Sequence, residues 1–195
     1  MTVRVNKDSF NLREKLSELD YAHVPYEKMP PGSVLQIATV RHRRSSGGQT
    51  LDQNYAEITG GTHVDSDSVN FEITIYPRLA TSRIIIQGSS HWYIVSNTSA
   101  PDWSGVIYRI AKYVDDVLIE TLMSGGNYDE SIYVSTTTQR SMGNKPIFGF
   151  DTPGTTGKVT YKIEAKAQTA AHDVNMHNTS YGPGGFLMAT EIKRE

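Results

Sequence analysis

Apolar and polar residues alternate over long stretches of the chain after residue 32, most clearly at 158–167. There the odd-numbered positions carry Val, Tyr, Ile and Ala, and the even-numbered positions carry Thr, Lys and Glu. Side chains of an extended strand point to opposite faces in turn, so this period predicts a strand with one buried and one solvated face. A second alternating stretch, 186–192, follows a glycine-rich break at 182–185.

The closing stretch places Phe186, Met188 and Ile192 on one face and Leu187 and Glu191 on the other. We expect the face with Phe186 to enter the core, so that a Phe186→Ala protein folds with reduced stability, because truncating a buried Phe costs about 3–5 kcal/mol. Removing this strand together with the residues after it would leave the backbone groups of its neighbour unpaired. We therefore expect the truncated chain to be insoluble or molten.

Further candidate strands are separated by turns, with no helical pattern between them. They cover residues 34–40, 71–75, 84–86, 92–95, 106–114, 117–122 and 132–138. Asp115 and Asp116 read as the turn of a hairpin between two of these strands. About eight to ten strands at this spacing predict an antiparallel sandwich or barrel, of which a jelly roll is one form. The order of the strands does not follow from one sequence.

Residues 1–31 have a different pattern. Leu12, Leu16 and Leu19 follow a capping-box spacing and fall on one face of a helix. A helix of about ten residues is marginal alone in water, so this leucine stripe must dock on its own domain, on copies of itself or on a neighbouring protein. A proline-rich connection follows. The sequence therefore predicts a helical arm and hinge over 1–31 and a β domain over 32–195.

Composition excludes several classes of protein. The net charge of −2 and the pI of about 6.3 give no indication of binding to nucleic acid or to an anionic membrane. The absence of cysteine removes disulfides, thiolate metal sites and thiol nucleophiles together. The sequence contains no apolar run of about eighteen residues, the length that would predict a transmembrane helix. The first residues lack the apolar core of a signal peptide, which fits synthesis in a cytoplasm.

Two features could contact a ligand or partner. Arg41, Arg43 and Arg44 form the densest positive cluster and could bind phosphate or an acidic polysaccharide, although a solvated strand end beside a loop is the simpler explanation. Trp103 lies in a loop-like stretch, where an exposed aromatic side chain could stack on a sugar or anchor a partner. The other aromatic residues weighed, Trp92, Tyr93 and Tyr108, fit a core or subunit interface better.

We expect no catalytic, metal or cofactor site. The chain has no Gly-x-Ser-x-Gly, phosphate-loop or dinucleotide-binding motif. Adjacent strand residues face opposite sides, so the neighbouring aspartates of the hairpin do not form an acid–base pair. Two further groups of possible metal ligands lack the spacing of known metal sites. These groups are His63 with Asp65, and His172 with Asp173 and His177.

The closing block resembles a known family. A strand that begins Gly-x-Val-Thr-Tyr at 157–161, an Asn- and Ser-rich loop, a glycine-rich break and a terminal strand with Ala-x-Glu-Ile are similar to the C-terminal domains of tailed-bacteriophage fibre and appendage proteins. The stretches 32–36 and 82–86 resemble a first and a central strand of that family. The resemblance implies a jelly roll of the tumour-necrosis-factor/C1q type, usually trimeric, and reaches over residues 32–195.

These observations lead to one expectation and two alternatives. We expect an all-β, antiparallel jelly-roll sandwich with a short helical arm, acting as a non-enzymatic structural protein of a phage particle. As a tail fibre or appendage it would be a homotrimer, bound to other virion proteins through its arm and to a host polysaccharide or receptor through its head. The alternatives are a capsid decoration or cement protein, and a carbohydrate-binding or polysaccharide-degrading lectin-like domain.

Overall fold

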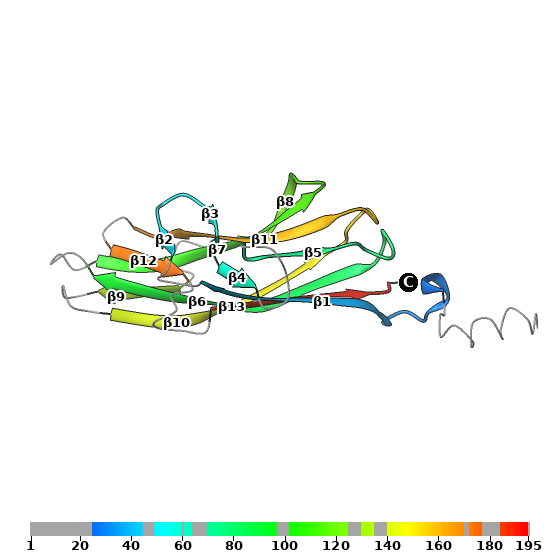
Figure 1. Cartoon of the computed structure of the whole chain (residues 1–195), viewed down its shortest axis with the longest axis horizontal. Helices are drawn as coiled ribbons and strands as arrows, with labels where there is room; N and C mark the ends of the chain where they lie inside the picture. Colours follow the sequence, from blue (N-terminus) through cyan, green and yellow to red (C-terminus); the bar gives the residue numbers. More distant parts are fainter. Residues whose placement is uncertain are drawn as a thin grey trace, which may run out of the picture.

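Two antiparallel β-sheets packed face to face make up the computed structural model of the chain (Figure 1). The structure describes residues 25–44, 49–59, 61–63, 70–96, 102–124, 130–134, 140–169, 172–176 and 184–194. The predicted helix with Leu12, Leu16 and Leu19 lies outside these residues. The described part of the arm contains one short 3-10 turn, η1 (Tyr26–Lys28).

The first sheet, sheet A, has seven strands among the described residues and is centred on the long strand β6. β10 pairs with β6 along one edge, while β13 and β12 share its other edge, and β13 in turn pairs with β1. Its strands are β1 (Val34–Arg44), β2 (Gln49–Leu51), β4 (Gly61–His63), β6 (Arg83–Ser96), β10 (Arg140–Asp151), β12 (His172–Met176) and β13 (Gly185–Ile192).

The second sheet, sheet B, has six strands in the part of the chain that the structure describes. β11 and β7 pair at its centre, β5 and β3 share the free edge of β11, and β8 and β9 share the free edge of β7. Its strands are β3 (Ala56–Glu57), β5 (Glu72–Ile75), β7 (Asp102–Val114), β8 (Val117–Ser124), β9 (Glu130–Val134) and β11 (Val159–Ala167).

The order of the longer strands is that of a jelly roll. Sheet A runs β10-β6-β13-β1 and sheet B runs β5-β11-β7-β8. If these eight strands are counted along the chain, the two sheets read 1-8-3-6 and 2-7-4-5, which are the two interlocked Greek keys of that fold. The expected all-β, antiparallel jelly-roll sandwich is therefore confirmed.

Apolar side chains from both sheets fill the space between them. β11 contributes every odd-numbered residue from 159 to 167, as its alternation predicted. The facing residues of β6 include Ile84, Ile86 and Ile94, none of which is exposed. Residues of both strands belong to one buried apolar cluster, so one core spans both sheets.

The closing strand β13 is confirmed, but its predicted orientation is wrong. Leu187, Ala189 and Glu191 are fully buried and face the core, whereas Phe186 is 37% exposed on the outer side. Both faces of this strand carry apolar residues, so alternation alone did not determine its phase.

Glu191 is tolerated inside because donors surround its carboxylate. The backbone N–H groups of Arg78 and Leu79 donate to its oxygens at 2.8 and 3.1 Å. The amide Nε2 of Gln36 donates to it at 2.6 Å. A buried carboxylate is stable only when hydrogen bonds replace those of water, and here a loop and a neighbouring strand supply them.

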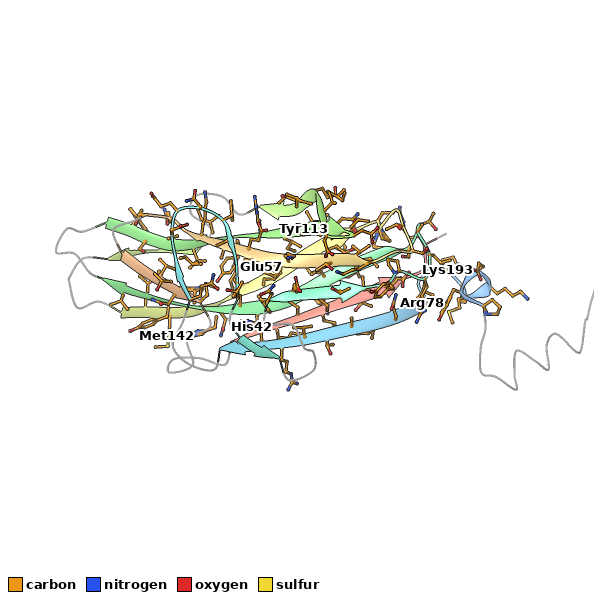
Figure 2. All side chains as sticks on the ribbon, turned by 45° about the horizontal axis from the view of Figure 1, so that its top comes forward. His42, Glu57, Arg78, Tyr113, Met142 and Lys193 are labelled. Atoms are coloured by element: carbon orange, nitrogen blue, oxygen red, sulfur yellow. The ribbon has the colours of Figure 1, made fainter. Side chains whose placement is uncertain are left out.

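The described end of the arm is attached to β13. Lys193, immediately after that strand, donates through its side-chain ammonium to the carbonyl oxygens of Glu27 and Met29 (Figure 2). The backbone N–H of Gly32 donates to the carbonyl of Lys193 at 2.9 Å. The arm therefore leaves the sandwich beside the start of β1 and the end of β13.

Candidate interaction surface

The outer face of sheet B carries charged residues that satisfy one another. Lys162 on β11 lies 3.1 Å from Glu57 and 3.4 Å from Glu72. Arg109 on β7 pairs with Glu164, and that carboxylate accepts the Tyr113 hydroxyl at 3.1 Å (Figure 2). These groups form a polar layer that already has its partners within the chain.

Burial shapes the ionisation of this layer. Burial raises the pKa of Glu57, against the opposing effect of Lys162. Burial lowers the pKa of Lys162, but its contacts with Glu57 outweigh burial and raise the pKa overall. Burial and the neighbouring Glu164 carboxylate raise the pKa of the Tyr113 hydroxyl. This face is polar and suits contact with water.

The outer face of sheet A is apolar instead. Its exposed residues include Ile37 at 58%, Met142 at 55%, Phe148 at 51% and Phe150 at 52%. Monomeric soluble proteins rarely expose large contiguous apolar patches, and such patches mark interaction sites. We call this outer face of β10, β6, β13 and β1 the apolar face.

The strand registers show that the apolar face is contiguous. One row across the sheet runs from Phe150 through Ile85 and Thr190 to Ile37. The next rows run Phe148–Gln87–Met188–Thr39 and Pro146–Ser89–Phe186–Arg41. The rings of Phe148 and Phe150 contact edge to face, with centroids 4.7 Å apart. Neighbouring rows on one face lie within side-chain contact, so the apolar groups form one surface.

Exposed apolar residues also lie on β8, at the edge of sheet B. Val117, Leu118 and Ile119 are 62%, 48% and 56% exposed. The tight turn before them holds Asp115 and Asp116 at φ of 48° and 65°. Two left-handed residues are typical of a two-residue hairpin turn, which confirms the predicted hairpin. We call these three β8 residues the apolar edge.

A polar cluster lies between the sheets, behind the apolar edge. The Lys112 ammonium on β7 donates to Asp151 at the end of β10 at 2.8 Å and to Glu120 on β8 at 3.2 Å. The Tyr161 hydroxyl on β11 donates to the other Asp151 oxygen at 2.7 Å. Burial and Asp151 together raise the pKa of Tyr161, so its hydroxyl stays protonated. We call these four residues the inter-sheet cluster.

The predicted contact residues do not come together. Arg41 is exposed on the apolar face, beside Phe186. Trp103 is 48% exposed on β7, where its neighbour Ser104 is buried, so Trp103 lies on the outer face of sheet B. The stretch with Trp103 is a strand rather than the expected loop. Arg43 and Arg44 belong to β1, although the structure does not describe their side chains.

The groups considered for metal chemistry are only partly placed. His63 lies on β4 and His172 and Asp173 on β12, while Asp65 and His177 lie outside the described residues. Among the side chains that the structure describes, no group of three or more His, Asp or Glu residues could hold a metal ion. In the same part of the chain, no helix has the length and apolar character to cross a membrane.

Sequence reasoning missed most of the apolar face because it missed β10. Gly143, Pro146 and Gly149 interrupt this strand and weaken its pattern. A Cβ at Gly143 would lie 2.7 Å from the Trp92 ring, so a residue without a side chain is needed there. Proline is tolerated because β10 is an edge strand. The run of Ile147, Phe148 and Phe150 is the signal that could have revealed a strand apolar on both faces.

No protein-family model and no curated protein matches the chain. A structure of infectious bursal disease virus, Gx strain, is similar at a TM-score of 0.37 and 11% identity over 86% of this chain and 41% of that one. Dimeric latent PorU from Porphyromonas gingivalis is similar at a TM-score of 0.33 and 11% identity, over 86% of this chain and 13% of that one. A mutant VP2 protein of infectious bursal disease virus is similar at a TM-score of 0.37 and 10% identity, over 82% of this chain and 36% of that one. This chain spans less than half the length of each, and likenesses this distant carry no argument about function.

Proposed function

We propose that this chain is a non-enzymatic structural protein of a phage particle, a tail fibre or appendage subunit that works as a homotrimer. The observation that carries the proposal is the contiguous apolar face, with Ile37, Phe148 and Phe150 half exposed. An ion-paired outer face on sheet B and an apolar one on sheet A are typical of a subunit that hides one side from water.

The apolar face and the apolar edge are different surfaces, and this difference favours a ring. If the edge of one copy packs on the face of the next, each copy uses both surfaces once, in a head-to-tail contact. Such contacts close into rings when the rotation allows. A trimer agrees with the family resemblance of the sequence, and its subunits would leave sheet B and its Trp103 facing solvent.

Sedimentation of the purified chain tests the assembly. We expect about three times the 21.7 kDa of one chain. A Phe148→Asp variant should sediment as a monomer at micromolar concentration, because it places a charge on the apolar face. A Trp103→Asp variant is the matched control, since it places the same charge on the outer face of sheet B and should remain trimeric. A wild-type chain that is strictly monomeric at micromolar concentration would contradict the proposal.

The particle assignment needs its own experiment. Antibody labelling of purified particles should mark the tail if the protein is a fibre or appendage. Labelling of the capsid would identify a decoration or cement protein. Absence from particles would favour a carbohydrate-binding domain, and the exposed Trp103 is then the first residue to test for sugar binding.

A further inference from the structure

We propose that Lys112 and Asp151 form an intramolecular isopeptide bond that joins the two sheets covalently. The Lys112 Nζ lies 2.8 Å from Asp151 Oδ1, and the two side chains are only 5% and 3% exposed. Lys112 belongs to β7 in sheet B, and Asp151 ends β10 in sheet A. A nucleophilic amine and a carboxyl group are therefore held in contact inside the sandwich, on strands that the fold fixes.

The other members of the inter-sheet cluster occupy the positions that a condensation needs. Tyr161 donates its hydroxyl proton to Asp151 Oδ2 at 2.7 Å, so it polarises the carboxyl group and stabilises negative charge that develops on this oxygen. Glu120 accepts from Lys112 Nζ at 3.2 Å and can take a proton from it. The Thr152 carbonyl, 3.3 Å from Nζ, helps to hold the amine in place.

The reaction balances without an external reagent. A proton moves from Nζ to Oδ1 along their hydrogen bond, which leaves a neutral amine and a neutral carboxylic acid. The Nζ lone pair then attacks Cγ and forms the C–N bond. Glu120 takes a second proton from Nζ and transfers it to Oδ1. The C–Oδ1 bond breaks with its electron pair and one water molecule leaves, while Oδ2 becomes the amide oxygen and keeps its hydrogen bond from Tyr161.

Placement inside the fold favours this condensation. Groups held in reactive contact reach effective molarities of about 10⁵–10⁸ M. The released water has an exit, because Asp151 and Glu120 line an open cavity of about 670 Å³ together with Arg83, Leu122, Phe150 and Thr152.

The bond would give this chain a covalent link between its two sheets, which it cannot form through a disulfide. The sequence contains no cysteine, so no disulfide can tie sheet A to sheet B. An amide between β7 and β10 would close a loop of the chain and restrict the unfolded state, as a disulfide does. Unlike a disulfide, it would survive reducing conditions.

Intact mass spectrometry of the full-length chain under denaturing conditions tests the proposal. We expect a mass lower than that of the sequence by one water molecule. Tryptic digestion should fail to cleave after Lys112 and should yield one branched peptide containing both Lys112 and Asp151. A wild-type chain at its full sequence mass, incubated folded until the mass no longer changes, would overturn the proposal and leave an ion pair only.

Two variants test which groups lose the water molecule and which group moves the proton. Lys112→Arg keeps the positive charge but presents a guanidinium that does not attack the carboxyl group, so this chain should show the full mass. Loss of water in Lys112→Arg would indicate cyclisation of Asp151 with its own backbone and would overturn the proposal. Glu120→Gln should form the bond at least tenfold more slowly after refolding, and an unchanged rate would remove Glu120 from the reaction.

Discussion

At the residue scale, the direction of a side chain depends on partners far away in the sequence. The pattern of 186–192 predicted a strand, but both faces of that strand were apolar enough to enter the core. Glu191 faces inward because Arg78, Leu79 and Gln36 donate hydrogen bonds to it, and these residues are remote in the chain. No local pattern contains that information, and so Phe186 was assigned to the wrong side.

The first prediction uses this reversal. Leu187→Ala should lower the free energy of unfolding by about 2–5 kcal/mol, because Leu187 is fully buried and its truncation leaves a cavity. Phe186→Ala should cost only about 1 kcal/mol, because its ring is partly exposed. Urea unfolding of both variants in the monomeric Phe148→Asp background keeps association out of the comparison. Equal losses would mean that the outward placement of Phe186 is wrong.

The second prediction concerns His91, which is 3% exposed on β6. Burial lowers its pKa from the ordinary value of 6.5, so the unfolded chain takes up a proton at a higher pH than the folded chain. Stability should therefore be lost as the pH falls below about 6.5, until the folded pKa is reached. Urea unfolding of wild type and His91→Gln at several pH values checks this. The wild type should lose more stability on acidification, and parallel curves would count against the assignment.

At the element scale, strands with one polar face were predictable and those with two apolar faces or many glycines were not. The alternation of β11 determined both its extent and its buried side. The hairpin of β7 and β8 followed from Asp115 and Asp116 between two apolar runs. β10 was missed because its glycines weaken the strand pattern. Gly143 and Gly149 are required by close contact with Trp92 and Ile110, which lie on other strands. The apolar face was missed with it.

The third prediction tests β13 as an element. This strand lies between β1 and β6, so its removal separates β1 from the rest of sheet A and exposes two rows of backbone groups. A chain ending at residue 185 should be insoluble, or soluble without a cooperative thermal transition. Circular dichroism against the full-length chain is the measurement. A cooperative melt at the full-length temperature would show that sheet A closes without β13.

At the scale of the whole molecule, the fold class was predictable from the sequence, but the order of the strands within each sheet was not. The number and spacing of strands indicated a sandwich, whereas the jelly-roll order depends on pairings between strands far apart in the sequence, such as β1 with β13. The apolar face also joins strands that are distant in the sequence. Sequence reasoning therefore placed the binding residues on single stretches, at Trp103 and at 41–44.

The fourth prediction concerns how copies meet. The chain has no cysteine, so introduced thiols report contacts without background. Chains with Ile119→Cys alone and chains with Ile37→Cys alone should each remain largely uncross-linked on oxidation. A mixture of the two, co-refolded so that subunits exchange, should form dimers linked by a disulfide. Dimers from either single variant alone would indicate that like surfaces meet, and would replace the head-to-tail arrangement.

The central position of β13 also bears on the order in which the molecule is made. β1 and β6 both precede β13 in the chain, and β13 is the last of the strands that the structure describes. Until β13 is made, β1 and β6 present unpaired edges and apolar rows, which are the features that attract other chains. Sheet A therefore closes only after β13 has been synthesised, and nascent chains lacking β13 are the form most exposed to chaperones and to one another.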